Sequence, residues 1–303
     1  MENIEPNQEN DQGDFLFYIF LLLAVLIGAM IGSLAAAGLG AATGIQLGEI
    51  MGVMGEDTPL GVRNYIRAAN GLSHLFTFTV PALVFAAYFY GKTYVTKLGF
   101  RPKIKNQNIL LGAVFMISSY PFIQLLYWLN KQLPLPEVLT GMEASAEQML
   151  QAMLTMNSPI ELMFNLLVVG VLPAVGEELI FRGLLQQRIQ RFLKNGHLAI
   201  WITALIFSAI HLQFEGFLPR MFLGAALGYL FYWTKNLWIP IIAHLIFNGM
   251  QVLGQYLAAE KMEQLEITET MNPNWFLALV SLALMLGIAF YLKNLNSAKQ
   301  ANV

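Results

Sequence analysis

Three short patterns of polar residues interrupt apolar segments in the second half of this 303-residue chain. They are Glu177-Glu178-x-x-x-Arg182, Phe207-x-x-x-His211 and His244-x-x-x-Asn248. An ionisable side chain inside a bilayer costs about 3 kcal/mol on insertion scales, so such residues usually face the bundle interior and mark a functional site. We therefore expect the polar residues of these patterns to form a catalytic, transport or ligand-binding centre.

A carboxylate, two imidazoles and an amide can together activate water and stabilise an oxyanion. A glutamate that acts as a base takes a proton from water, while a histidine orients that water or shares the proton. A second histidine and an asparagine can donate hydrogen bonds to the negative charge that develops on a tetrahedral intermediate. Amide hydrolysis is the reaction that these residue types favour.

The first pattern contains two adjacent carboxylates that need not share one role. Glu178 and Arg182 are four residues apart with the acid first, which is the favourable order for an ion pair on one helix face. Glu177 points about 100° away around the helix, so it is free for a different role. Pro173 and Gly176 come just before this pattern and predict a break or bend in the helix there.

Composition predicts an all-α polytopic membrane bundle. Hydrophobic residues make up 56% of the sequence and charged residues 12%, and the mean hydropathy is +0.56. A membrane span needs about 20 apolar residues whose backbone groups are paired within one helix. Without cysteine, the chain has no disulfide, thiolate nucleophile or thiolate metal site. We expect about eight transmembrane helices, near residues 15–42, 68–90, 109–129, 159–175, 198–212, 217–233, 237–257 and 274–292.

These spans are expected to form a single bundle over residues 15–293, between a disordered polar tail at 1–14 and a short tail at 294–303. Lys and Arg concentrate in the segments 92–105 and 188–194. Because short cytoplasmic loops collect these residues, both segments and both termini are predicted to be cytoplasmic. The protein is expected to be multi-pass, in the plasma (inner) membrane if its source is bacterial.

Three other polar residues are given structural interpretations. His74 is expected to be a histidine at a helix interface, and His197, which follows Asn195 and Gly196, a solvated loop residue. Glu161 falls near the end of an apolar run, which predicts a position at the membrane interface.

In this order and on separate apolar segments, the three patterns resemble those of the CPBP family. That family comprises type II CAAX prenyl endopeptidases and bacteriocin-processing or Abi-type membrane proteins. The resemblance covers about residues 159–250, which would form the catalytic core of the bundle. It implies an intramembrane, glutamate-dependent endopeptidase.

The resemblance also implies roles for individual residues. Glu177 resembles the catalytic base, and His211 the partner that helps to activate water. His244 and Asn248 resemble the pair that stabilises the oxyanion, and the other two polar residues of the first pattern have a supporting role. The implied substrate is a membrane-associated peptide, either a prenylated CAAX-type peptide or a leader or bacteriocin-like precursor. Membrane lipid is a further expected partner, and no nucleic acid is expected.

The metal requirement stays open at this point. Members of the family have been called metalloproteases (metalloendopeptidases), and a metal-free glutamate mechanism is also attributed to them. We favour no cofactor; the alternative is zinc held by Glu177, His211 and His244, a familiar type of hydrolytic ligand set. The sequence lacks the His-Glu-x-x-His motif that would favour zinc.

Two other functions are consistent with the same residues. One is a non-proteolytic membrane scaffold or bacteriocin self-immunity protein with the same fold. The other is a proton-coupled transporter in which carboxylates and imidazoles form a relay. An inverted repeat with paired broken helices would favour transport, and the sequence shows no such repeat.

Overall fold

The computed structural model describes residues 8–45, 58–262 and 273–297, and all regular secondary structure in these ranges is helical. The α-helices are α1 (Gln8–Thr43), α3 (Leu60–His74), α4 (Val80–Tyr90), α5 (Tyr94–Lys97), α6 (Asn106–Lys131), α7 (Glu137–Leu154), α8 (Pro159–Asn165), α9 (Leu172–Glu178), α10 (Gln187–Leu193), α11 (Gly196–Ala209), α12 (Phe217–Thr234), α13 (Trp238–Met262) and α14 (Trp275–Ser297). Between them lie three π-helical segments and one short 3₁₀ turn: η1 (Leu75–Thr79), η3 (Leu166–Val171), η4 (Leu179–Gln186) and η2 (Gly91–Thr93).

The protein is a polytopic helical membrane protein. Six helical segments of the described part are long and apolar enough to cross a membrane: Phe15–Thr43, Leu60–Lys97, Asn106–Lys131, Pro159–Leu193, Trp238–Ala258 and Trp275–Ser297. The other two of the eight predicted spans do not meet these criteria. Helix α11 has only 14 residues, and at about 1.5 Å per residue it is shorter than the hydrocarbon core of a bilayer. In α12, Arg220 and several polar aromatic residues lower the mean hydropathy.

The helix boundaries differ from the predicted tails. Helix α1 begins at Gln8 and therefore includes residues 8–14 of the segment predicted as a disordered tail. Helix α14 ends at Ser297, inside the predicted C-terminal tail. The remaining parts of both predicted tails, 1–7 and 298–303, lie outside the described residues.

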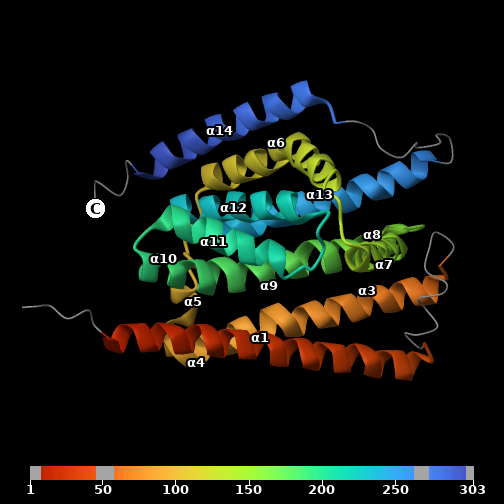
Figure 1. Ribbon diagram of the computed structural model, residues 1–303, viewed down its shortest axis with the longest axis horizontal. Coiled ribbons are helices and arrows are strands. Elements are labelled where there is room, and N and C mark those ends of the chain that lie inside the picture. Colours follow the sequence, from red (N-terminus) through yellow and green to blue (C-terminus); the bar gives the residue numbers. More distant parts are fainter. Residues whose placement is uncertain (1–7, 46–57, 263–272, 298–303) are drawn as a thin grey trace, which may run out of the picture.

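The helices form three layers (Figure 1). In the outer layer on one side, α1 packs against α3, η1 and α4. On the other side, α6 packs against α14 and against α12 and α13 of the central layer. The central layer contains α9, η4, α11, α12 and α13, so the segment with the three polar patterns lies in the middle of the bundle (Figure 1).

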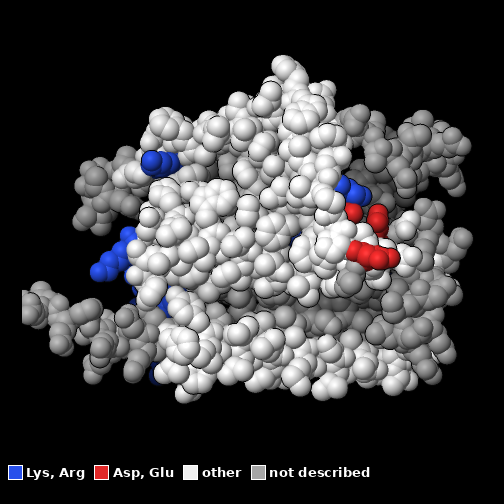
Figure 2. Space-filling model, in the orientation of Figure 1, with Lys and Arg blue, Asp and Glu red and all other residues white. Residues whose placement is uncertain are grey.

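The two ends of the bundle differ in charge. Helix α1 begins and α14 ends at the same end of the bundle (Figure 1). Figure 2 shows most of the Lys and Arg side chains of this face at that end, and the Asp and Glu side chains at the opposite end. This distribution agrees with the prediction, made from the Lys and Arg residues of the loops, that both termini lie on one side of the membrane.

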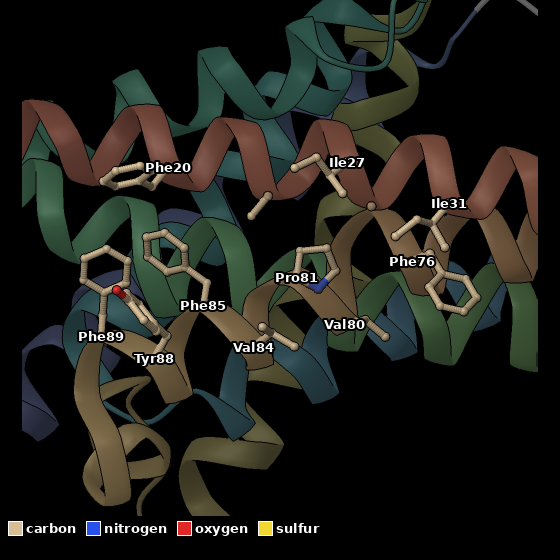
Figure 3. A pocket seen from close by; sticks show the side chains of 12 residues that line it. Phe20, Ile27, Ile31, Phe76, Val80, Pro81, Val84, Phe85, Tyr88 and Phe89 are labelled. Carbon is tan, nitrogen blue, oxygen red and sulfur yellow. The ribbon is translucent and has the colours of Figure 1, made fainter.

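A cavity of about 540 Å³ lies between α1 and the segment formed by η1 and α4 (Figure 3). Its labelled side chains are apolar apart from the phenol of Tyr88 (Figure 3). Next to it, a Cβ atom on Gly28 would lie 2.0 Å from the carbonyl oxygen of Phe76, so only glycine lets the two helices approach so closely. The cavity offers no acid, base or amide and is therefore not the place of the predicted chemistry.

Candidate functional site

Glu177 lies at the centre of the bundle between two imidazoles from different helices. Glu177 belongs to the last turn of α9, and the residue is 6% exposed. The Nε2 atom of His74, at the end of α3, is 3.1 Å from Glu177 Oε1. The Nε2 atom of His244, in α13, is 3.9 Å from Glu177 Oε2. One carboxylate oxygen therefore has a close imidazole partner, and the other has a longer contact with a second imidazole.

Glu178 has a different environment, although it is the next residue. Its Oε1 atom accepts a hydrogen bond from Arg182 Nη1 at 2.7 Å and contacts His244 Nδ1 at 3.0 Å. Arg182 also donates from Nη2 to the carbonyl of Gly224, at 2.6 Å. The carboxylate and the guanidinium are both fully buried. The predicted ion pair between positions 178 and 182 is confirmed.

His244 connects the two carboxylates. It is 2% exposed, and its contact with Glu178 through Nδ1 fixes the ring so that Nε2 faces Glu177. A histidine whose one nitrogen is held by a carboxylate presents the other nitrogen in a defined direction. Glu178 therefore orients the His244 ring so that it faces Glu177.

Asn248 lies one helical turn after His244, but the contact that its side chain makes is with η3. Its Nδ2 group donates to the carbonyl oxygen of Val169, at 2.9 Å. Pro173 lacks the N–H that a regular helix would donate to this carbonyl, four residues earlier. The amide of Asn248 is thus held where the proline interrupts the helical hydrogen-bond pattern, and it keeps a second N–H for another acceptor.

His211 follows α11 and is held against Phe207. Its Nδ1 atom is 2.8 Å from the carbonyl oxygen of Phe207, and the two rings meet edge to face with their centroids 5.1 Å apart. Burial lowers the pKa of His211, while the negative charge of Glu177 opposes this shift. The sequence predicts His211 beside the carboxylate, but among the described residues its contacts are with Phe207, and no hydrogen bond or ion pair joins it to Glu177.

Prolines shape the backbone around Glu177. The π-helical segments η1 and η3 are followed by Pro81 in α4 and Pro173 in α9, and prolines disturb the hydrogen bonding of the preceding turn. Single π-helical turns often occur at functional sites. The break that the sequence predicts near Pro173 is confirmed as the change from η3 to α9.

An ion cluster fixes α3 against α8. Arg63 Nη2 and Arg67 Nη1 lie 2.9 and 2.8 Å from Glu161 Oε2, and all three residues are buried. Arg67 also donates from Nε to the carbonyl of Met153. Glu161 lies at the start of the candidate span Pro159–Leu193, near a span end as predicted, and the two arginines pair with its carboxylate there. They come from a distant part of the chain, so local sequence could not indicate this.

His74 is part of the site, although the sequence predicts only a histidine at a helix interface. It lies at a helix interface as expected, but its partner there is Glu177. One feature of the sequence could have indicated this role: His74 lies within a membrane-spanning segment, Leu60–Lys97. Ionisable residues in such segments usually have a functional or pairing role. By contrast, His197 is exposed in the first turn of α11 and contacts the hydroxyl of Tyr229 at 3.0 Å.

The zinc alternative requires three ligands to converge. In the ranges that the structure describes, no group of three or more His, Asp or Glu side chains is placed to hold a metal ion. Glu177, His211 and His244 therefore do not form the ligand set that the zinc alternative needs. In this set, His244 Nε2 and Glu177 Oε2 lie 3.9 Å apart. The hydrogen-bonding contact of His244 Nδ1 with Glu178 explains why Nε2 faces Glu177.

An apolar groove of about 480 Å³ runs beside the site. Its walls come from α1, η1, η4, α10 and α11. Phe78 lines the groove, and its ring centroid lies 4.6 Å from that of His74. Phe181, another lining residue, packs edge to face on Phe207. The groove thus shares aromatic walls with the residues around Glu177.

The sequence is similar to those of known bacterial proteins. YpbD, an uncharacterized protein of Bacillus subtilis, is 28% identical over 117 residues, which cover 36% of this chain and 57% of YpbD. The membrane-embedded CAAX protease MroQ of Staphylococcus aureus is 26% identical over 175 residues, which cover 56% of this chain and 67% of MroQ. The chain thus spans between half and about two thirds of the length of these relatives. No solved structure matches.

A family model agrees with the extent of the site. It is described as type II CAAX prenyl endopeptidase Rce1-like, and it matches residues 159–250. This segment contains Glu177, Glu178, Arg182, His211, His244 and Asn248. Residues 159–250 are therefore similar to the Rce1-like type II CAAX prenyl endopeptidase (CPBP) family, and a longer part of the chain is similar to a membrane-embedded CAAX protease.

Proposed function

We propose that this protein is an intramembrane endopeptidase in which Glu177 activates water for hydrolysis of a peptide bond. The observation that carries the proposal is the different pairing of two adjacent buried carboxylates. Glu178 is engaged by Arg182 and His244, whereas Glu177 has only imidazoles as close partners in the described part of the chain. A buried carboxylate that is not paired with an arginine can accept and return a proton.

The first step is attack by water. Glu177 takes a proton from a water molecule as that molecule attacks the carbonyl carbon of the scissile bond, and His211 orients the water. The product of this step is a tetrahedral intermediate with a negatively charged oxygen. Burial strengthens each hydrogen bond to that oxygen, because little water competes for it.

The second step breaks the C–N bond. The protonated Glu177 gives its proton to the leaving nitrogen, so that one water is consumed and an amine and a carboxylic acid are formed. A protonated His244 donates from Nδ1 to Glu178 and keeps its Nε2–H for the oxyanion. The second N–H of Asn248 completes the donor pair, and its contact with Val169 supports its orientation.

The proposed substrate is a peptide at the membrane, either a prenylated CAAX-type peptide or a leader or bacteriocin-like precursor. The match of residues 159–250 to a CAAX endopeptidase family model and the name of MroQ support this class. The apolar groove beside Phe78 and Phe181 supports access for an apolar substrate from the bilayer. We further propose that both termini lie in the cytoplasm, which agrees with the even number of candidate spans, six, in the described part of the chain. The membrane is the plasma membrane if the source is bacterial.

The test is cleavage by the purified full chain in detergent. Wild type and Glu177→Gln would be compared on a library of membrane-associated and prenylated peptides, with and without a strong zinc chelator. We expect chelator-resistant cleavage by the wild type and none by the variant, with equal thermal stability. Equal cleavage by the variant would overturn the role of Glu177, and zinc-dependent cleavage would contradict the metal-free chemistry. A folded wild type that cleaves no peptide would favour the scaffold function.

A further inference from the structure

The contact between His74 and Glu177 joins the site to a part of the chain outside the matched family segment. His74 belongs to α3, whereas the family model begins at residue 159. Its side chain is 12% exposed, and Nε2 lies 3.1 Å from Glu177 Oε1. This is the shorter of the two imidazole contacts of the carboxylate, because His244 Nε2 is 3.9 Å from Oε2.

Two features of the fold bring His74 to this position. Arg67 lies seven residues earlier, about two helical turns, and therefore on nearly the same face of α3. Its ion pair with Glu161 holds that face against the family segment. At the other side, a Cβ atom on Gly176 would lie 3.1 Å from His74 Cε1 and 2.6 Å from Thr79 Oγ1. The close approach of α3 and η1 to α9 therefore depends on a glycine immediately before Glu177.

The environment of the ring selects its tautomer. In the residues that the structure describes, Nδ1 of His74 is buried without a hydrogen-bond partner. A hydrogen on Nδ1 would be a buried unpaired donor, which is costly, whereas a hydrogen on Nε2 meets the carboxylate. The His74 ring also packs against Phe78, with a ring-centroid distance of 4.6 Å. The ring is thus held in one plane with one useful N–H.

We propose that His74 is a positioning residue for Glu177, and this inference rests on the proposed function. The neutral imidazole donates from Nε2 to Oε1 of the carboxylate. This bond holds one oxygen and leaves Oε2 directed at the water and at His244. His74 does not itself exchange a proton with water or substrate; it fixes the orientation of the group that does.

The kinetic test compares three variants of the full chain. His74→Leu keeps the bulk of the side chain and removes the donor, and His74→Gln can place an amide N–H near the position of Nε2. We expect His74→Leu to lower kcat about 10- to 100-fold, the range of effects for a misplaced catalytic group, with KM within about twofold. His74→Gln should recover part of the loss. The matched control is His197→Leu, in which an exposed histidine is changed and kcat should not change.

A spectroscopic readout makes the test independent of any substrate. In protein with ¹⁵N-labelled histidine, the ring nitrogens of His74 should show the Nε2–H tautomer, and Glu177→Gln should shift the Nε2 resonance. An Nδ1–H tautomer, or no response to Glu177→Gln, would overturn the proposal. So would wild-type kcat in His74→Leu together with loss of cleavage in Glu177→Gln. If Glu177→Gln cleaves as well as the wild type, the proposed function itself fails.

Discussion

Glu177 and Glu178 are adjacent in sequence and both buried, yet their side chains have different partners. Glu178 is fully buried in an ion pair with Arg182 and holds Nδ1 of His244. Glu177 keeps 6% of its surface exposed and faces the Nε2 atoms of His74 and His244. The separation follows from the helix itself, since neighbouring residues point about 100° apart.

The comparison indicates a division of roles between the two carboxylates. A carboxylate that is paired with arginine is fixed as an anion and can orient its neighbours, but it is poorly suited to accept a proton. A carboxylate held by a neutral imidazole stays available for proton transfer. Removing Glu178 or its partner should therefore affect stability most, and removing Glu177 should affect chemistry most.

The largest expected effect on stability comes from Arg182→Met, which leaves Glu178 as an uncompensated buried charge. Loss of one partner of a buried ion pair costs about 3–5 kcal/mol. The free energy of unfolding, measured by reversible denaturation in detergent, should fall by that amount. The control is Arg191→Met, an exposed arginine in α10, for which we expect a change within about 0.5 kcal/mol. If the two variants were equally stable, the ion pair would not stabilise the fold.

A smaller effect is expected from Gly176→Ala, which tests the packing that brings α3 to Glu177. The added methyl group would meet Thr79, Phe78 and His74. Overpacking of this kind costs about 1–3 kcal/mol, measured in the same denaturation experiment, and cleavage should fall as well. Gly254→Ala is the control, because a Cβ atom there meets no atom within 4 Å. If both variants behaved alike, the close approach at Gly176 would be unimportant.

The smallest expected effect is the change that the charge of Glu177 makes to the pKa of His211. Burial lowers the pKa of His211, so its ring should titrate below the ordinary value of about 6.5 in an NMR titration. Glu177 opposes that shift, and Glu177→Gln should therefore move the midpoint lower still. Because the native state favours the neutral ring, acidification through the ordinary value should weaken folding. A midpoint that does not respond to Glu177→Gln would place the two residues too far apart to act together.

Local features of the fold and site could be predicted from the sequence. The pair formed by Glu178 and Arg182 follows from a spacing of four residues on one helix, and Pro173 indicates its own break in the helix. Apolar composition is enough to predict a membrane bundle. The number of spans could not be predicted in this way, because a short helix such as α11 has the composition of a span without its length.

Contacts between distant segments were beyond the reach of sequence patterns. His74 and Glu177 are separated by 103 positions, and Arg67 and Glu161 by 94. Which partner pairs with a buried polar side chain depends on which distant helix packs against it. The roles assigned to Glu177, His211, His244 and Asn248 remain predictions that kinetic experiments can test.

The central claim is that Glu177, and not Glu178, activates water. The most direct measurement is the cleavage rate of Glu177→Gln and Glu178→Gln on one peptide substrate, divided by the fraction of folded protein in each sample. We predict a loss of about 10²- to 10⁴-fold for Glu177→Gln, the usual range for a general base, at near wild-type stability. Glu178→Gln should unfold more readily and lose less activity per folded molecule. A larger loss in Glu178→Gln than in Glu177→Gln would contradict the account.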